Sequence, residues 1–210
     1  MADALKFKAV NPGTKVQFYE LPNGSDTNAR QFQPITNTYK KFLFVGSLNY
    51  FPNVNGLKWF VETIFKHLPA SFELNIVGRS PNQDDFSYLS AYPNVNLIGQ
   101  VDDVEAYYRT HDVFVVPLLE GSGTRLKILE AMSYGKLVLS TPKGIEGIAA
   151  RDGIDYLEFN NFESFKSNIL KRLDDFEGLE TIRKKGRQFI ENSYSWETIV
   201  ENYVKQHHEQ

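Results

Sequence analysis

Short, mostly apolar runs recur along this chain, and most of them stop at a glycine or a proline. Segments with a helical spacing of apolar residues separate them. Strands that are apolar along their length and alternate with helices are typical of a parallel sheet covered on both faces. The sequence therefore predicts an α/β fold, a doubly wound, Rossmann-like parallel sheet, with strands at Phe42–Val45, Leu74–Val77, Val95–Ile98, Val113–Val116 and Leu137–Ser140.

The longest helical stripe runs from Leu57 to Leu68, with apolar residues at i, i+3, i+4, i+7, i+8 and i+11. It predicts one helix, preceded by a long loop. Asp102 or Asp103 can cap a second helix, and Gly135 can close a third. The expected helices are residues 57–68, 84–91, 102–110 and 124–134, followed by a helical tail from residue 162 in about three pieces, with breaks near 177–178 and 192–193.

The first 38 residues differ in composition from the rest. The turn formers Asn11-Pro12-Gly13 and Pro22-Asn23-Gly24 flank one possible strand, residues 16–19. We therefore expect residues 1–38 to be a linker that enters the domain, and residues 39–210 to be that domain with its C-terminal helices.

Charge and composition exclude several classes of protein. The 23 Lys and Arg nearly balance the 26 Asp and Glu, so no broad basic field is available for nucleic acid or anionic lipid. The chain has no cysteine, and its four histidines are too scattered for a metal cluster. No apolar stretch reaches the ~20 residues that span a bilayer, and the first residues do not follow a signal-peptide plan. We expect a cytoplasmic protein that binds neither nucleic acid nor a metal.

One loop carries the strongest chemical signal. It follows Pro117 and reads Glu120-Gly121-Ser122-Gly123-Thr124-Arg125-Leu126-Lys127. Doubly wound sheets bind ligands at the carboxyl ends of their strands, where helix N-termini present free amides. Arg125 and Lys127 are two cations at a helix N-terminus, which the helix dipole alone disfavours. The loop is therefore a candidate diphosphate cradle, although glycines at such places also serve the turn itself.

Glu130 lies one helical turn beyond Lys127, and two interpretations stay open. Its carboxylate can accept hydrogen bonds from two neighbouring ribose hydroxyls. Alternatively, Glu130 and Lys127 form an ion pair on an exposed helix face, worth roughly 0.3–0.5 kcal/mol. The spacing favours neither.

These residues resemble a known family, the retaining GT-B glycosyltransferases of family 4 (glycosyl transferases group 1), in their C-terminal, donor-binding domain. The run from Gly121 to Met132, with Gly135-Lys136 and Ser140-Thr141 after it, is similar to the donor-site signature of that family. Further similarities follow in the family's order over roughly residues 20–205: Pro22-Asn23-Gly24, Phe44-Val45-Gly46-Ser47, Ile76-Val77-Gly78, Gly99, Val101, residues 106–112 and Tyr194-Ser195-Trp196.

The resemblance implies two Rossmann-like domains facing a cleft, of which this chain is the second. It implies a nucleoside-diphosphate sugar as donor, no metal or other cofactor, and transfer with retention in polysaccharide or glycoconjugate synthesis. Arg125 and Lys127 would stabilise charge on the diphosphate leaving group, and Glu130 would bind the ribose. The other implied donor contacts are Gly46, Ser47, Gly121, Ser122, Gly123 and Thr124, with Gly78, Arg79, Gln100 and Val101 at the base.

The sequence departs from the family pattern at three places. Ser122 stands where the family has its first glutamate, which normally contacts the donor sugar. Ser47 and residues 49–53 replace an arginine and a following lysine, which would shift the phosphate role to Arg125 and Lys127. The aromatic residue of the entry segment is displaced to Phe32.

Two further expectations concern the whole protein. Nothing before Pro22 could supply an N-terminal acceptor domain, so we expect the chain alone to be inactive, with any membrane contact made through the missing domain. Two other functions stay open: a non-catalytic nucleotide-binding or protein-interaction module of doubly wound fold, and a GT-B nucleotide-sugar epimerase.

Overall fold

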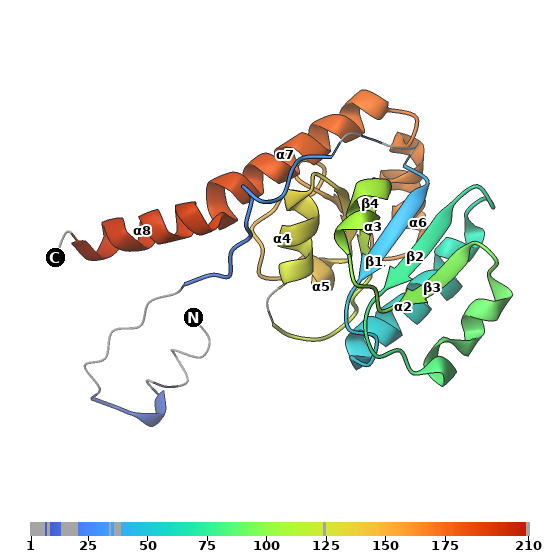
Figure 1. Ribbon diagram of the computed structural model, residues 1–210, viewed down its shortest axis with the longest axis horizontal. Helices are drawn as coiled ribbons and strands as arrows, with labels where there is room; N and C mark the ends of the chain where they lie inside the picture. The colour runs from blue at the N-terminus through green and yellow to red at the C-terminus, as the bar shows by residue number, and fades with distance from the viewer. Residues whose placement is uncertain are drawn as a thin grey trace.

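A six-stranded parallel sheet forms the centre of the computed structural model, which describes residues 7, 9–13, 21–33, 35, 39–123 and 125–208. The strand order is β3-β2-β1-β4-β5-β6, so the chain reverses its direction of travel between β1 and β4. The strands are β1 (Lys41–Val45), β2 (Glu73–Val77), β3 (Val95–Gly99), β4 (Val113–Val116), β5 (Leu137–Ser140) and β6 (Leu157–Glu158) (Figure 1). The predicted doubly wound α/β fold is confirmed.

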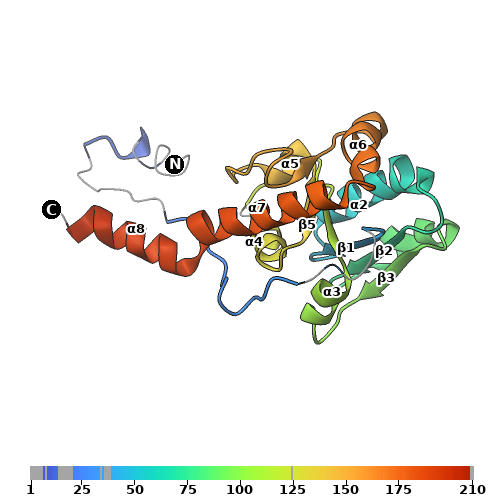
Figure 2. The same cartoon turned by 90° about the horizontal axis from the view of Figure 1, so that it is seen from above.

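Helices cover both faces of this sheet. In Figure 2, α2 (Phe51–Thr63) and α6 (Phe162–Asn168) lie on one side of the strands and α3 (Glu105–Thr110) on the other. The remaining helices are α4 (Leu126–Ser133), α5 (Pro142–Ile145), α7 (Phe176–Tyr194) and α8 (Trp196–His208), with 3₁₀ helices at Phe65–His67, Gln83–Ala91 and Leu170–Arg172.

Successive residues of the central strands alternate between two hydrophobic cores. On β1, Phe42 and Phe44 belong to the core that contains α2 and α6, whereas Leu43 belongs to the core that contains α3 and α4. All three side chains are fully buried. Because a strand presents its side chains alternately to the two faces, a sheet covered on both faces requires apolar residues at every position. This requirement explains the mostly apolar runs in the sequence.

The stripe from Leu57 to Leu68 does not form one helix, and the long loop expected before it is wrong. Helix α2 begins at Phe51, with Pro52 in its first turn, and ends at Thr63. A separate 3₁₀ helix then carries Phe65. Proline is tolerated in the first turn of a helix because the amide it lacks has no intrahelical partner there, so the Asn-Tyr-Phe-Pro segment opens a helix.

The breaks expected in the helical tail are also misplaced. Residues 176–194 form one continuous helix, α7. Gly178 lies in its first turn, where its amide donates to the side chain of Asp175 at 2.9 Å. The breaks fall between Asn168 and Phe176, and at Ser195. Strand β6 and helix α5, with two and four residues, are too short to show a pattern in the sequence.

Residues 21–33, here called the entry segment, lie against α4 and α7. The guanidinium of Arg187 on α7 donates to the carbonyl oxygens of Thr27, Arg30 and Ser133. The hydroxyl groups of Ser25 and Ser133 are 2.8 Å apart. The possible strand at residues 16–19 lies outside the described residues. The entry segment is thus tied to the domain by side-chain hydrogen bonds to its backbone.

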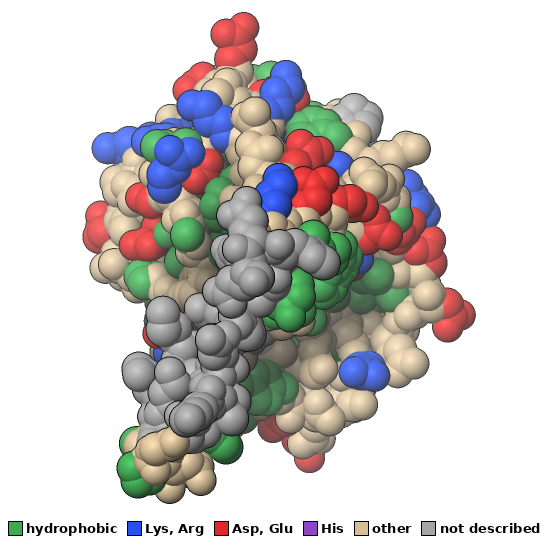
Figure 3. All heavy atoms as spheres, turned by 90° about the vertical axis from the view of Figure 1, so that its left-hand side faces the viewer, with side chains coloured by type: hydrophobic (Ala, Val, Ile, Leu, Met, Phe, Trp, Pro, Cys, Tyr) green, Lys and Arg blue, Asp and Glu red, His purple; other side chains and the backbone are tan. Residues whose placement is uncertain are grey.

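Helix α8 extends beyond the sheet domain (Figure 1). Its apolar side chains Trp196, Val200, Tyr203 and Val204 follow a helical stripe and are each more than 40% exposed. On the face of the molecule that this end of the chain occupies, acidic and basic side chains intermingle over the upper part (Figure 3). No helix in the described part of the chain is long and apolar enough to cross a membrane.

Candidate functional site

The loops after β1, β2 and β3 lie side by side at the carboxyl edge of the sheet. The Gly78 amide donates to the Gly99 carbonyl at 2.8 Å, and the Leu48 amide donates to the Arg79 carbonyl at 3.0 Å. A Cβ atom on Gly78 would lie 1.8 Å from the carbonyl oxygen of Gly46. Only glycine fits at position 78, because the two loops are in backbone contact. The structure therefore brings Gly46, Gly78 and Arg79 together at one edge of the sheet.

A cavity of about 510 Å³ opens between the β1 and β4 ends, at the point where the strand order reverses. Crevices at such points are the usual ligand sites of doubly wound sheets. Five predicted site residues line it, with five others between them: Gly46, Ser47, Asn49, Tyr50, Asn53, Leu118, Ser122, Arg125, Leu126 and Lys127. We call it the β1–β4 cavity.

Lys127 extends its amine into the wall of the β1–β4 cavity. Its Nζ donates to Asn53 Oδ1 at 2.8 Å and lies 4.6 Å from the centre of the Phe44 ring. Burial, together with the smaller effect of the nearby charge of Arg125, lowers the pKa of Lys127 to about 7. No described carboxylate forms an ion pair with this amine. When it is protonated, the Lys127 amine therefore carries a positive charge that no carboxylate of the described residues balances.

Asn53 holds that amine in place, although it is not among the site residues predicted from the sequence. Its Nδ2 donates to the carbonyl of Ser47 at 2.8 Å, while its Oδ1 accepts from Lys127. The side chain is buried, so it joins the loop after β1 to helix α4. Nothing in the local sequence indicated this role, because residues 49–53 were expected to form a loop.

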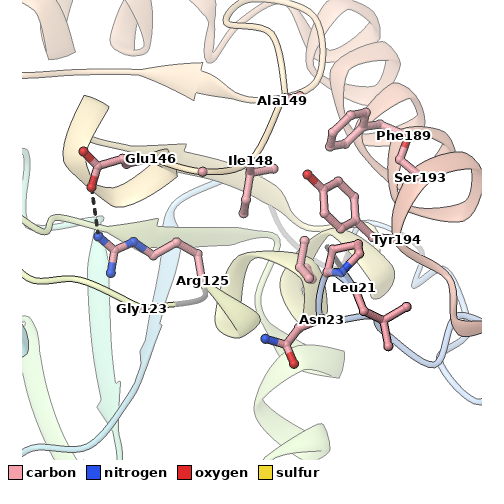
Figure 4. Close-up of a pocket in the computed structure, with 13 residues that line it drawn as sticks. Leu21, Asn23, Gly123, Arg125, Glu146, Ile148, Ala149, Phe189, Ser193 and Tyr194 are labelled. Atoms are coloured by element: carbon pink, nitrogen blue, oxygen red, sulfur yellow. Dashed lines mark ion pairs between the residues drawn. The ribbon is translucent and has the colours of Figure 1, made fainter. Parts of the chain in front are cut away.

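Arg125 holds the glycine-rich loop together. Its guanidinium donates to the carbonyls of Gly121, Ser122 and Lys143 at 3.1–3.4 Å. Glu146 lies 3.8 Å away, on the α5 side (Figure 4). The Nε atom is buried and has no hydrogen-bond partner among the described residues. Part of the charge on Arg125 is thus committed to the shape of the loop.

Both glycines of this loop have left-handed backbone conformations. Gly121 and Gly123 each have φ of +101°, a region that glycine enters at no steric cost. Ser122 between them is exposed, and Thr124 lies outside the described residues. Gly123 faces a second cavity, of about 790 Å³, which Arg125 also lines. The glycines therefore serve the turn, whether or not a ligand approaches them.

Glu130 lies outside both cavities and does not pair with Lys127. Its Oε1 lies 3.1 Å from Nη2 of Arg30 in the entry segment, and its Oε2 accepts from the Tyr108 hydroxyl at 3.3 Å. Of the two interpretations left open, the Lys127–Glu130 ion pair is wrong, because each side chain has a different partner. The Glu130 side chain is 29% exposed, so part of the carboxylate stays accessible.

The residues predicted for the base lie farther along the same edge. Arg79 and Gln100 are exposed, while Val101 packs in part against the core that contains α3. They do not line the β1–β4 cavity. Within the described ranges, no three His, Asp or Glu side chains are grouped as metal ligands.

Comparison with known proteins identifies the family. The family model "Glycosyl transferases group 1" matches residues 39–175, which is more than half of the chain. This chain belongs to that family. A curated protein from the cps region of Klebsiella pneumoniae is 29% identical over 175 residues, and the capsular polysaccharide biosynthesis glycosyltransferase CapM of Staphylococcus aureus is 28% identical over 130 residues. The matches cover 78% and 60% of this chain but only 45% and 34% of those proteins.

Solved structures show the same fold. The C-terminal domain of the group 1 glycosyltransferase LpcC from Francisella tularensis superposes with a TM-score of 0.62 at 16% identity, covering 82% of this chain and all of that domain. HepE from Anabaena, solved with UDP-glucose, superposes with a TM-score of 0.64 at 14% identity, covering 99% of this chain and 62% of that one. The fold is that of the C-terminal domain of a GT-B glycosyltransferase.

Proposed function

We propose that this chain is the donor-binding half of a retaining glycosyltransferase that takes its sugar from a nucleoside diphosphate, in polysaccharide or glycoconjugate synthesis. The observation that carries the proposal is the amine of Lys127, which lies in the β1–β4 cavity without a counter-charge. A buried lysine without a partner carboxylate is costly unless a ligand supplies the negative charge. A diphosphate supplies it.

Lys127 is the direct diphosphate ligand in this proposal, and Arg125 contributes both charge and loop shape. The amine and the guanidinium flank the N-terminus of α4, whose free amides also favour an anion. Charge that develops on the leaving diphosphate would be stabilised by donors already in place, with no reorganisation. Gly78, Arg79, Gln100 and Val101 lie along the same edge and are the proposed base contacts. Relatives named for capsule synthesis, and the UDP-glucose in the Anabaena structure, support a nucleotide-sugar donor.

Partners of the complete protein form part of the same proposal. The exposed apolar stripe of α8 and the carboxyl edge of the sheet are the surfaces that an acceptor domain would cover. Because this chain spans less than half of its curated relatives, we assign acceptor binding to the rest of the protein, and any membrane contact with it. The complete protein is expected in the cytoplasm, where nucleotide sugars are available.

Calorimetric titration of the 210-residue chain with UDP, GDP and ADP tests the proposal. We expect one of them to bind equally well with EDTA and with added Mg²⁺, because the positive charges belong to the protein. Lys127→Met should weaken that binding by roughly 1.5–3 kcal/mol, the range for hydrogen bonds to charged groups. Lys58→Met is the matched control, since it removes an exposed lysine from α2. Loss of binding in EDTA, or binding unchanged in Lys127→Met, would contradict the proposal.

Ser122 favours a second function, that of a non-catalytic nucleotide-binding module. It is exposed in the glycine-rich loop, where the family signature has an acidic residue for the donor sugar. Titration with UDP-glucose beside UDP separates the two functions. A donor site should bind the two with different affinities because it contacts the sugar, whereas a module that binds only the nucleotide should bind them equally.

A further inference from the structure

The carboxylate of Glu130 is held at both of its oxygen atoms by residues from two different parts of the chain. Arg30 of the entry segment contacts Oε1 at 3.1 Å. Tyr108 of α3 donates its hydroxyl to Oε2 at 3.3 Å. Glu130 itself belongs to α4. Three elements therefore meet at one carboxylate.

The geometry points to a positioning role: we propose that Arg30 and Tyr108 fix the Glu130 carboxylate to receive a ligand with two neighbouring hydroxyl groups, the diol of a ribose. This inference rests on the proposed function, in which the donor is a nucleotide, and on the role of ribose ligand that the family resemblance implies for Glu130. It adds two residues to that function. Arg30 lies outside residues 39–175, the part of the chain that the family model matches.

The hydroxyl of Tyr108 is a hydrogen-bond donor held in a fixed position. Its side chain is fully buried, and its ring stacks on Tyr134 at 4.5 Å and on Phe114 at 5.8 Å between centroids. Burial raises the pKa of the Tyr108 hydroxyl well above its usual value, and the charge of Glu130 raises it further. The hydroxyl stays protonated, so it must donate, and an ionised carboxylate can only accept. The direction of this hydrogen bond is therefore set.

Arg30 is held in place independently of Glu130. Its Nη1 donates to Ser25 Oγ at 3.1 Å and to the Asp26 carbonyl at 3.3 Å, and its guanidinium lies over the Tyr134 ring. The Arg30 carbonyl accepts from Arg187 of α7 at 2.7 Å. Both ends of the residue are anchored, so the charge that faces Glu130 has little freedom to move.

The carboxylate keeps acceptor capacity for a ligand. An ionised carboxylate has about four acceptor positions, and the two described contacts occupy two of them. The side chain is 29% exposed, which leaves a path to solvent. A diol supplies two donors at neighbouring carbons and matches the free positions. An acceptor that is already oriented loses less entropy when the ligand binds, which is the advantage of holding both oxygens.

Two other roles for Arg30 predict different results. If the contact is purely structural, the Arg30–Glu130 ion pair only holds the entry segment against α4. Its removal would then leave nucleotide affinity unchanged, and it would change stability little because the pair is partly exposed. As a latch, Arg30 would block the carboxylate, and its removal would tighten nucleotide binding. A positioning residue instead weakens binding when it is removed, and only through Glu130.

The experiment measures affinities of the full 210-residue chain for UDP, GDP and ADP, their nucleosides and pyrophosphate. Tyr108→Phe removes only the hydroxyl, and we expect it to weaken binding of the nucleotide and of its nucleoside alike by about 3- to 10-fold, because the hydroxyl acts on the ligand only through Glu130. Arg30→Met should weaken both by about 10-fold or more, since its contact is charged. Pyrophosphate, which has no diol, should bind both variants as it binds the wild type.

Matched variants control for charge and folding. Arg109→Met removes an exposed arginine that contacts Asp103 and Glu105, and Tyr107→Phe removes the hydroxyl of the neighbouring tyrosine; both should bind like the wild type. Thermal unfolding of every variant detects a loosened entry segment. If Arg30→Met fails to fold, the Tyr108→Phe variant still tests the positioning role. It keeps the buried aromatic ring and loses only the hydroxyl.

The Glu130→Gln background separates failure of this inference from failure of the proposed function. In that background, Tyr108→Phe and Arg30→Met should cause no further loss. If Glu130→Gln weakens nucleoside binding while Tyr108→Phe and Arg30→Met bind normally, the positioning role is overturned and the ribose role of Glu130 stands. Tighter binding by Arg30→Met would establish a latch and also overturn it. If Glu130→Gln itself binds every nucleotide normally, the ribose role falls, and this inference with it.

Discussion

At Lys127, burial favours the neutral amine, whereas the proposed binding of a diphosphate favours the charged amine. Burial lowers the pKa of this amine to about 7, whereas a lysine in the unfolded chain titrates near 10.4. Between these values the unfolded chain binds more protons at this site than the folded chain. Stability contributed by this group therefore rises with pH over that window, and the charged amine is a cost near neutrality. A bound diphosphate reverses the cost by stabilising the charged form.

We predict that diphosphate binding takes up a proton at Lys127. Above pH 7 the free amine is increasingly neutral, while the bound diphosphate raises its pKa, so affinity should fall as pH rises, by up to about tenfold per unit. Titrations between pH 7.5 and 9 avoid the phosphate ionisation near pH 6. Lys127→Arg should remove the slope, because a guanidinium stays charged throughout. A pH-independent wild-type affinity would show that the amine does not contact the diphosphate.

At the scale of elements, α2 contributes Asn53 to the wall of the β1–β4 cavity. Gly56 lies in the middle of α2, and a Cβ there would approach the carbonyl oxygen of Pro117, directly after β4, to 2.3 Å. That neighbour is backbone and cannot move alone. The helix therefore packs closely at this point, and the same helix carries Asn53 to Lys127.

We predict that Gly56→Ala destabilises the domain although alanine favours helices by about 1 kcal/mol over glycine. Forcing α2 away from Pro117 should cost about 1–3 kcal/mol, as for other overpacked sites. The urea midpoint should fall with an unchanged slope, and nucleotide affinity should fall too, because Asn53 moves with the helix. Lys58→Ala, at an exposed position of α2, should change neither quantity. A more stable Gly56→Ala variant would mean that propensity outweighs the contact.

At the scale of the whole molecule, the hydrophobic core is buried, whereas the carboxyl edge of the sheet, where the candidate site lies, is exposed. Both faces of the sheet are covered, and β4 and β5 are buried along their whole length. The carboxyl edge and the α8 stripe stay exposed in the described part of the chain. We therefore expect folding to need only this domain, and sugar transfer to need the rest of the protein as well.

We predict that the isolated chain unfolds cooperatively and binds a nucleoside diphosphate but transfers no sugar. The wall of the cleft that would position an acceptor and exclude water is not part of the described domain. Release of UDP from UDP-glucose, with and without candidate acceptors, measures turnover. Release well above the protein-free background would contradict this prediction, and non-cooperative unfolding would contradict the closed core.

The sequence by itself determined the fold class, five of the six strands and the loop that carries Arg125 and Lys127. These features are local: apolar runs with glycine ends, a helical period, and two cations at one helix start. The confirmed strands are the ones long enough to show a pattern, whereas β6, with two residues, shows none. The start of α2 was also not predicted. Proline is common both in the first turn of a helix and in loops, so the local sequence does not distinguish the two.

Only the tertiary structure decided which side chains meet. Arg30 and Glu130 lie 100 residues apart in the chain, and Asn53 and Lys127 lie 74 apart. Spacing on α4 suggested that Glu130 pairs with Lys127, since i and i+3 residues are neighbours on a helix. The fold instead supplied a different partner to each, because α2 lies on one side of α4 and the entry segment on another. The period of apolar residues in the sequence predicts which side chains share one face of a helix or strand. Contacts between elements depend instead on how the sheet brings those elements together.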